Sequence, residues 1–496
     1  MYFLGLDIGS SSTKASILDA ATGKSLASTH YPKSELAITA PQAGFAEQQP
    51  ETWWECVKQA CAELFALEQV NPQKIEAIGI SYQMHGLVCV DKNQQVVRPA
   101  IIWCDSRAVE IGEQAFNQLG QQKCLQQFLN SPGNFTASKL KWVKENQPEL
   151  YQQIDKIMLP GDYIAMKLSG DVTTTSSGLS EGVLWDFENN QVATDIIKHY
   201  GFEHSLIPTL VPSFGEQCTV SQQAAKELGL RAGIKITYRG GDQPNNALSL
   251  NVMQAGEVAA TAGTSGVIYA VTDKNVYDEQ SRVNTFQHVS STTDNNANGV
   301  LLCVNGTGRL FSWLRSVVSV QGQQVDYPYL NELAKDVAIG SDGLSMLPFG
   351  NGAERVLQNK NIGGHIQNLD FNRHQLGHMV RAAQEGIVFA LKYGFDVLKD
   401  MGVSSQVIRA GKGNMFLSPI FVEAFVNSCQ TTVELYQTDG AEGAARGAGF
   451  GLGYYSNRAE MFNGLELCAQ YEPEAAKVDA YANAYHNWQQ LLQQSI

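Results

Sequence analysis

The chain has 496 residues, of which 44% are apolar and only 17% charged, and its formal net charge is −14 at pH 7. This length exceeds what a single hydrophobic core holds, so we expect two domains. A strongly negative surface repels polyanions, which argues against nucleic acid or an anionic membrane surface as a partner. The composition is that of a globular protein.

The sequence also carries information on the cellular compartment of the protein. The first residues form a strand-like run and lack the charged and then apolar layout of a signal peptide. No uninterrupted apolar run approaches the roughly 20 residues of a membrane-spanning helix. The nine cysteines include no Cys-x-x-Cys pair, which favours reduced thiols over a disulfide framework or a zinc site. We therefore expect a cytoplasmic protein without a membrane partner.

Strands and helices alternate along the first half of the chain. Apolar runs at residues 3–8 and 13–18 predict a β-hairpin, and apolar spacing at 52–67 predicts a helix. Further strands are expected at 75–81, 87–90 and 101–103, and further helices at 134–146 and 162–169. This alternation predicts an α/β architecture.

The second half repeats the scheme about 250 residues later. The elements expected here are strands at 234–238 and 407–410, a second hairpin around 257–273, and helices at 307–318, 374–399, 418–428 and 440–453. We place the boundary near residue 247, which gives an N-terminal domain over 1–247 and a C-terminal domain over 248–496. The segment after about Tyr454 is expected to form a peripheral cap.

Both hairpins turn through small, hydroxyl-bearing residues. The first turn reads Gly9-Ser10-Ser11-Ser12-Thr13-Lys14 and the second Gly263-Thr264-Ser265-Gly266. Glycine lets the backbone approach a phosphate, amides and hydroxyls donate hydrogen bonds, and Lys14 adds a positive charge. Neither turn is a Walker loop, and one copy alone would favour an ordinary polar turn. Two copies predict ATP chemistry in a cleft between two similar domains.

Two aspartates end strands beside these turns. Asp7 could hold Mg²⁺ through water, although a turn-capping role is equally compatible with its position. Asp242 follows two glycines and precedes a predicted helix, so it could cap that helix. A carboxylate at a helix N-terminus is kept ionised by the dipole and is ready to accept a proton. The residues alone leave cap and base open.

Polar and aromatic residues also follow strands in the N-terminal half. They are Gln83, Met84 and His85 after one strand, and Trp103 and Asp105 after another. Such side chains suit a neutral polyol, and ligands of open α/β sheets bind at strand ends. Each residue alone is more often structural. A strand-to-helix turn over Gly411–Asn414 could likewise contact adenine or ribose, or be an ordinary turn.

Taken in order, these motifs resemble the FGGY carbohydrate kinases. The resemblance rests on Asp7-Ile-Gly-Ser-Ser-Ser-Thr-Lys14, Met84-His-Gly86, Gly241-Asp242, Ala262-Gly-Thr-Ser265 and the Gly-rich segment near the C-terminus. It implies the two-domain, actin-like or ribonuclease H-like ATPase fold, with a cleft between the domains. Within the family the chain is most similar to the branch that acts on xylulose, through Tyr82-Gln-Met-His-Gly86, Trp103-Cys-Asp-Ser-Arg107, Thr136-Ala-Ser-Lys-Leu-Lys-Trp142 and Leu159-Pro-Gly-Asp-Tyr163.

The resemblance implies ATP-dependent phosphorylation of D-xylulose at its 5-hydroxyl, with Asp242 as the proton acceptor and a homodimer as the assembly. The sugar contacts it implies are Gln83, Met84, His85, Trp103, Asp105 and Asp242. The nucleotide contacts are Ser10, Ser11, Ser12, Lys14, Gly263, Thr264, Gly308, Gly411 and Asn414, and the Mg²⁺ contacts are Asp7 and Asp242. The chain departs from the family at Ala410–Met415, where a glycine-rich run is usual, and at Gln243-Pro244.

Two alternatives remain open. A kinase of the same fold could use ribulose, gluconate, glycerol or another polyol, but an anionic acceptor needs a cation in the sugar pocket, and only Arg107 is evident in the sequence. A non-catalytic ATPase switch is the second alternative. A switch of this kind would not need Met84-His85 and Asp242, and we expect no appended peptide-binding domain.

Overall fold

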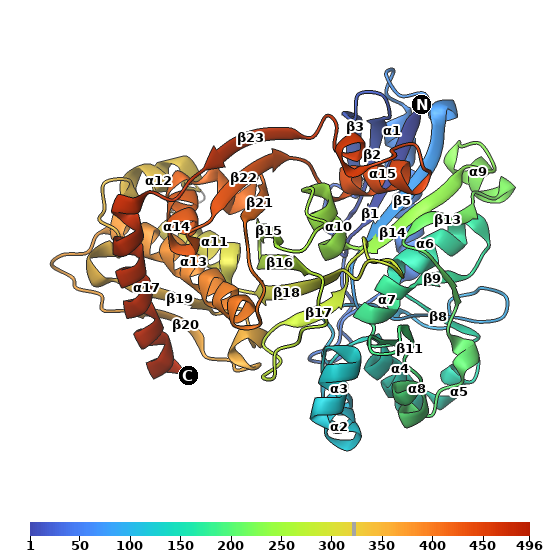
Figure 1. Ribbon diagram of the computed structural model, residues 1–496, viewed down its shortest axis with the longest axis horizontal. Helices are drawn as coiled ribbons and strands as arrows, with labels where there is room; N and C mark the ends of the chain where they lie inside the picture. Colours follow the sequence, from blue (N-terminus) through green and yellow to red (C-terminus); the bar gives the residue numbers. More distant parts are fainter. Residues whose placement is uncertain (320–323) are drawn as a thin grey trace.

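The computed structural model describes residues 1–319 and 324–496, and two β-sheets flanked by helices form its two halves (Figure 1). The first sheet contains, in order, β13 (Phe214–Thr219), β14 (Lys235–Gly241), β5 (Ile75–Tyr82), β1 (Tyr2–Ile8), β2 (Thr13–Asp19) and β3 (Ser25–Tyr31). The second contains β17 (Asn284–Gln287), β18 (Asn298–Val304), β16 (Gly266–Thr272), β15 (Glu257–Ala262), β21 (Val407–Gly411), β22 (Thr432–Gln437) and β23 (Glu466–Tyr471). Among these residues we find no helix that has both the length and the apolar composition for crossing a bilayer.

The two sheets share one strand pattern. In the first sheet β1, β2 and β3 are antiparallel neighbours, whereas β1, β5 and β14 run parallel. In the second sheet β15, β16 and β18 are antiparallel neighbours, whereas β15, β21 and β22 run parallel. An antiparallel strand, β13 or β23, closes the parallel end of each sheet. The hairpin repeat read from the sequence is therefore part of a repeated six-strand pattern, which confirms the predicted α/β architecture of two similar halves.

Strand β1 explains how the first sheet is covered. Its side chains alternate between the two faces, as the pleat of a strand requires. Leu4, Leu6 and Ile8 pack in the core that contains α1 (Pro50–Phe65) and α6 (Pro160–Ser169). Phe3 packs on the opposite face with α15 (Gly440–Gly451). Asp7 alternates in phase with Phe3, so its carboxylate lies on the α15 face.

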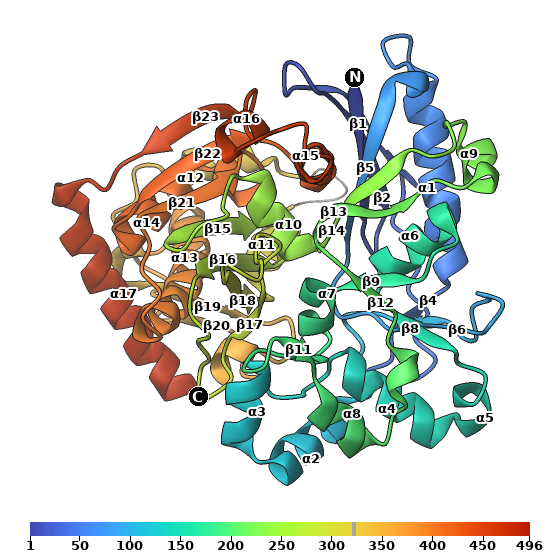
Figure 2. The same ribbon diagram turned by 45° about the vertical axis from the view of Figure 1, so that its right-hand side comes forward.

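Helix α15 lies between β22 and β23 of the second sheet in the sequence but packs on the first sheet, beside β1 and β5 (Figure 2). The approach is close because both partners lack bulk. A Cβ at Gly5 would lie 1.8 Å from the carbonyl oxygen of Ala441, and one at Gly79 would lie 2.0 Å from that of Ala444. The helix predicted at 440–453 is therefore present, and its small residues permit close packing. The boundary near residue 247 stays a prediction, and α15 is the element that crosses it in space.

The core of the second half is built around α13 (Leu376–Asp400), whose apolar residues are buried against the second sheet and α14 (Pro419–Cys429). The C-terminal helix α17 (Ala475–Ser495) closes this core. The indole of Trp488 is buried there and donates a hydrogen bond to the carbonyl of Met346 at 2.9 Å. The segment after Tyr454 thus supplies β23 to the sheet and α17 to the core.

The two halves also meet through short elements. Helix α10 (Asp242–Ser249) packs on α15 and contacts strands of both sheets. On another side, α7 (Ser176–Glu181) binds the edge strand β17: the hydroxyl of Ser177 donates to the carbonyl of Gln287 at 2.9 Å, and the amide of Gln287 donates to Ser180 at 2.9 Å. These contacts bring the ends of β1, β5 and β14 to face the second sheet.

Candidate active site

A cavity of about 560 Å³ lies between the two halves. The predicted site residues that line it are Asp7, Ser10, Ser11, Ser12, Lys14, Gln83, Met84, His85, Trp103 and Asp242. The second half adds lining residues such as Ser265, Cys303 and Arg355. Residues from the turn of the first hairpin, the end of β5 and the start of α10 therefore meet in one space, although the sequence separates them widely.

A second cavity, of about 550 Å³, lies in the second half. Of the predicted nucleotide contacts, Gly263, Thr264, Gly308 and Asn414 line it, together with apolar side chains such as Phe311, Tyr327, Met415 and Leu417. Thr264 lines this cavity while the adjacent Ser265 lines the first one, so the β15–β16 turn borders both. Gly411 is absent from both linings; it is the last residue of β21 and pairs with β22.

Asp242 is the first residue of α10, and Gly241 is the N-cap. At this position the helix dipole, which favours the ionised carboxylate, is opposed by burial, which favours the neutral form. Burial and the negative charge of Asp7 together raise the pKa of Asp242 to about 7, while hydrogen bonds from Gln243 oppose the shift. Desolvation destabilises the charged form of the carboxylate more than the dipole of a short helix stabilises it.

Asp7 lies at the end of β1, where its Oδ1 accepts a hydrogen bond from the hydroxyl of Ser81 at 2.7 Å. Burial raises the pKa of Asp7, and the charge of Lys14 opposes that shift. The carboxylates of Asp7 and Asp242 line the same cavity and supply hard oxygen donors, which are the ligands that Mg²⁺ prefers. The donor set present therefore fits Mg²⁺.

Two buried acceptors belong to residues of the first half that line the cavity. Oε1 of Gln83 and Oδ1 of Asn134 have no hydrogen-bond partner within residues 1–319 and 324–496. Both residues line the cavity. Buried polar atoms are nearly always paired, so unpaired acceptors on a cavity wall indicate a ligand that donates hydrogen bonds. Trp103 is 51% exposed at the same cavity, and its indole nitrogen donates to Ser10 Oγ at 3.3 Å.

Asp105 does not line the cavity, in contrast to the position expected of a sugar contact. Its carboxylate is fully buried and accepts from the amide of Ala46 at 2.6 Å and from Nη2 of Arg107 at 2.7 Å. Arg107 also pairs with Glu47 at 2.8 Å. The charge of Arg107, the cation that the sequence offered for an anionic sugar, is therefore already neutralised by two carboxylates. The backbone carbonyl of Asp105 accepts from the side-chain amide of Asn134. Asp105 thus supports a cavity-lining residue from behind.

The sequence reading missed several lining residues. Arg355 enters the cavity from the second half, and its Nη1 donates to the carbonyl of Ser281 at 2.9 Å. Burial lowers the pKa of Arg355 to about 10, so it remains charged at neutral pH. In the sequence, the turn-forming residues Gly350-Asn351-Gly352 shortly before Arg355 mark a loop, and this is the local feature that could have drawn attention to Arg355. Asn284 and Cys303 lie on strands, where nothing in the local sequence marks which face they take.

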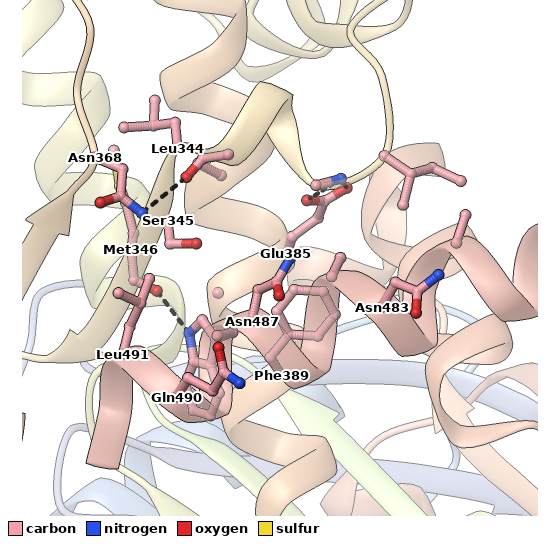
Figure 3. Close-up of a pocket in the computed structure, with 18 residues that line it drawn as sticks. Leu344, Ser345, Met346, Asn368, Glu385, Phe389, Asn483, Asn487, Gln490 and Leu491 are labelled. Atoms are coloured by element: carbon pink, nitrogen blue, oxygen red, sulfur yellow. Dashed lines mark hydrogen bonds between the residues drawn. The ribbon is translucent and has the colours of Figure 1, made fainter. Parts of the chain in front are cut away.

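A further cavity, of about 480 Å³, lies elsewhere in the second half, between α13, α17 and β19 (Ser345–Phe349) (Figure 3). At its wall Glu385 accepts from Nε of Arg381 at 2.7 Å and from the amide of Gly340 at 3.1 Å. None of the predicted site residues lines this cavity. It lies apart from the cleft that holds the candidate site.

Comparisons with known proteins agree with this arrangement. Residues 2–249 match the N-terminal domain, and residues 258–450 the C-terminal domain, of the FGGY family of carbohydrate kinases. The xylulose kinase of Haemophilus influenzae is 29% identical over 99% of both chains. The xylulose kinase structure from Rhodospirillum rubrum superposes with a TM-score of 0.88 at 23% identity, covering 100% of this chain and 99% of the other. The gluconate kinase structure from Lactobacillus acidophilus superposes at 0.87 with 21% identity, covering 99% and 98%.

The family match spans both halves, and the structural likeness confirms the predicted two-domain fold of the actin-like ATPases. Membership implies use of ATP to phosphorylate an alcohol group of a sugar. The residues around the cleft are of the types that such a transfer needs. The chain belongs to the FGGY family of carbohydrate kinases.

Proposed function

We propose that this kinase transfers the γ-phosphoryl group of ATP to the 5-hydroxyl of D-xylulose, with Asp242 as the general base. The observation that carries the proposal is the single cavity lined by Asp242, by the first hairpin turn and by the Gln83–His85 segment. Relatives named xylulose kinase, aligned over nearly the whole chain, support the choice of sugar.

The sugar would lie against the wall formed by Gln83, His85 and Asn134, since unpaired acceptors there suit hydroxyl donors. Asp242 would accept the proton of the attacking hydroxyl. A carboxylate is a weak base, but the loose transition state of phosphoryl transfer places little demand on the nucleophile. Its main contribution is the position of the hydroxyl and the removal of one proton.

The nucleotide would occupy both cavities. Its base would lie among the apolar side chains around Tyr327 and Leu417, and its phosphates would pass the turn at Thr264 and Ser265 toward Lys14. Mg²⁺, when held near Asp7 and Asp242, would neutralise charge on the phosphates. Closure of the two halves would exclude water and so limit hydrolysis of ATP.

A coupled assay of ADP release with purified protein, ATP and Mg²⁺ tests this proposal, with and without D-xylulose. The expected result is ADP release that depends on D-xylulose and a product whose mass is that of a pentulose phosphate. ADP release that does not need a sugar would indicate an ATPase switch instead. A panel of ribulose, glycerol and gluconate separates the remaining acceptors.

Arg355 gives one reason to include an anionic sugar in that panel. It is a charged residue on the cavity wall, whereas Arg107 is held by Asp105 and Glu47 away from it. An aldonate carboxylate could pair with such a guanidinium. Turnover of gluconate that exceeds turnover of D-xylulose, and that is lost in Arg355→Gln, would make the aldonate the acceptor.

A further inference from the structure

His85 adopts a backbone conformation that its side chain disfavours. Its φ is 60°, in the left-handed region, which costs free energy for a residue other than glycine. Such a conformation persists when the surroundings hold it. Here the backbone amide of His85 donates to Oε2 of Glu181 at 3.0 Å, and its carbonyl accepts from Nζ of Lys139 at 2.8 Å. Two buried side chains therefore hold the strained residue, Glu181 at its amide and Lys139 at its carbonyl.

The ring of His85 is oriented by the same neighbour. Its Nδ1 lies 2.9 Å from the backbone carbonyl of Glu181, which can only accept, so Nδ1 carries the proton. Burial and the charge of Lys139 together lower the pKa of His85 to about 3, so the ring is neutral. In a neutral ring with a proton on Nδ1, Nε2 carries a lone pair and can accept a hydrogen bond. The ring packs against Phe135 and Phe286, at centroid distances of 4.9 and 5.1 Å.

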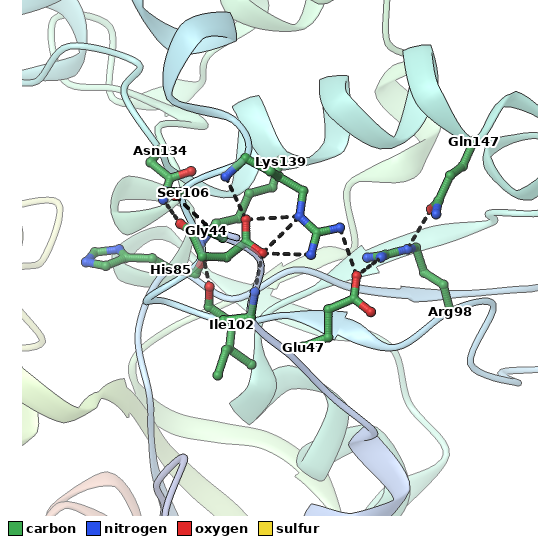
Figure 4. A network of polar contacts seen from close by, with 12 residues as sticks. Gly44, Glu47, His85, Arg98, Ile102, Ser106, Asn134, Lys139 and Gln147 are labelled. Carbon is green, nitrogen blue, oxygen red and sulfur yellow. Dashed lines mark hydrogen bonds and ion pairs between the residues drawn. The ribbon is translucent and has the colours of Figure 1, made fainter. Parts of the chain in front are cut away.

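Neither holding residue is explained by the proposed chemistry. Glu181 is almost fully buried at the end of α7, and its Oε1 accepts from the hydroxyl of Tyr82 at 2.6 Å. Burial raises the pKa of Glu181 well above its usual range. Lys139 is also fully buried, in α4 (Thr136–Asn146), and donates to the carbonyls of His85 and Ile102 (Figure 4). Burying two ionisable groups is unfavourable, so a role that depends on their positions is indicated.

We propose that Glu181 and Lys139 are positioning residues that hold His85 with Nε2 as a hydrogen-bond acceptor on the sugar side of the cleft. Nε2 of His85, Oε1 of Gln83 and Oδ1 of Asn134 then form a set of three acceptors, the acceptor wall. This wall favours a ligand whose hydroxyl groups donate hydrogen bonds to it. The inference rests on the proposed function and extends it to the substrate class: a neutral polyol whose hydroxyls donate to three fixed acceptors.

Kinetics of matched variants test the positioning role. Glu181→Ala removes the acceptor for the His85 amide, whereas Glu181→Gln keeps one oxygen for it. Tyr82→Phe removes the other hydrogen bond of the same carboxyl without touching His85. We expect Glu181→Ala to raise the KM for the sugar by about tenfold, the effect of losing one hydrogen bond of ordinary strength, with the KM for ATP unchanged. Glu181→Gln and Tyr82→Phe should stay close to the native protein.

A sugar KM that is unchanged in Glu181→Ala would overturn the role of Glu181. So would an equal rise in Tyr82→Phe, because the effect would then reflect the packing of the carboxyl. Lys139→Met is expected to raise the sugar KM in the same way, because it releases the His85 carbonyl. If Glu181→Ala does not fold, Lys139→Met still tests how His85 is held, with Tyr82→Phe as its control.

The acceptor role of His85 has a separate test that needs no turnover. In ¹⁵N-histidine spectra, the full chain gives signals from nine histidines, and the signal of His85 is the one that is absent from the spectrum of His85→Asn. We expect this signal to show a neutral ring with the proton on Nδ1 across neutral pH. A proton on Nε2 would overturn the acceptor wall. If D-xylulose is not phosphorylated but the Nδ1 proton is observed, the proposed function fails and the inference about His85 stands.

Discussion

Gly5 on β1 and Ala441 on α15 meet backbone to backbone, with room for no side chain between them: a Cβ at Gly5 would lie 1.8 Å from the Ala441 carbonyl oxygen. A strand from the start of the chain is thereby joined to a helix from near its end. The same helix begins beside Asp7, since a Cβ at Gly440 would lie 2.5 Å from its Oδ2. The contact that joins the two parts of the chain therefore also positions a carboxylate of the cleft.

Gly5→Ala should destabilise the protein, because neither backbone can move without disturbing the first sheet. Overpacking of this kind typically costs about 1–3 kcal/mol in free energy of unfolding, which urea denaturation measures. Gly413→Ala is the matched control: Gly413 has an extended backbone with φ −165° and open space around the Cβ position. Equal stability of both variants would contradict the close packing of α15.

Asp242→Asn should lower kcat while leaving nucleotide binding nearly intact, because the amide keeps the shape of the side chain but cannot accept the proton. A positioned general base typically contributes on the order of 10²–10⁴-fold. Steady-state kinetics give kcat, and calorimetry gives the affinity for ATP. Asp479→Asn, at an exposed position on α17, serves as the control. Near-native turnover of Asp242→Asn would remove the base role.

Activity should depend on Mg²⁺ and on the carboxylate of Asp7. Chelation by EDTA is expected to abolish turnover, and added Mg²⁺ to restore it. Asp7→Asn should raise the Mg²⁺ concentration needed for half-maximal activity, because a neutral amide is a weaker ligand for a hard cation than a carboxylate. The titration is done at saturating sugar and ATP. An unchanged Mg²⁺ requirement would argue that Asp7 acts through Ser81 and Lys14 alone.

Two of the three glycines assigned to the nucleotide, Gly308 and Gly411, should differ in effect when they are replaced by alanine. A Cβ at Gly308 would lie 2.2 Å from the carbonyl oxygen of Gly263, so Gly308→Ala should displace the β15–β16 turn and raise the KM for ATP. A Cβ at Gly411 would meet nothing within 4 Å, and Gly411 lines neither cavity, so Gly411→Ala should leave that KM unchanged. A comparable rise in Gly411→Ala would restore the nucleotide contact that the family resemblance implies.

Glu354 makes stability depend on pH. Its carboxylate accepts from the amide of Asn305 at 3.0 Å, and burial raises its pKa to about 7. The unfolded chain loses this proton near the ordinary glutamate pKa of about 4.3, whereas the folded protein keeps it until about pH 7. The contribution of Glu354 to stability is therefore largest at low pH and is lost as the pH rises to about 7.

Urea unfolding of the native protein and of Glu354→Gln at pH 5 and pH 8 checks the sign. Relative to the native protein, the variant should be more stable at pH 8 than at pH 5 by roughly 2–3 kcal/mol, because the amide does not ionise. Glu149→Gln, at an exposed position, should show no such difference. A difference of opposite sign would mean that the carboxylate is stabilised in its ionised form.

Local patterns were enough for much of the fold. The run at 307–318 predicted α11 (Thr307–Val318) with the bounds that the structure has, and the two hairpins around Gly9 and Gly263 occur as predicted. Most candidate site residues also line one of the two cavities, because parallel strands end at the same edge of a sheet. Their individual roles stay predictions, as does a homodimer.

What the sequence determined by itself is the periodicity of each element, the repeated hairpin and the turn chemistry at strand ends, because these depend on neighbours along the chain. Tertiary structure alone decided which partner each side chain meets. Asp105 is held by Arg107 behind the cavity, Arg355 enters it from the other half, and the pKa of Asp242 follows from burial beside Asp7. Burial and charge act through space, so residues far apart in sequence decide them.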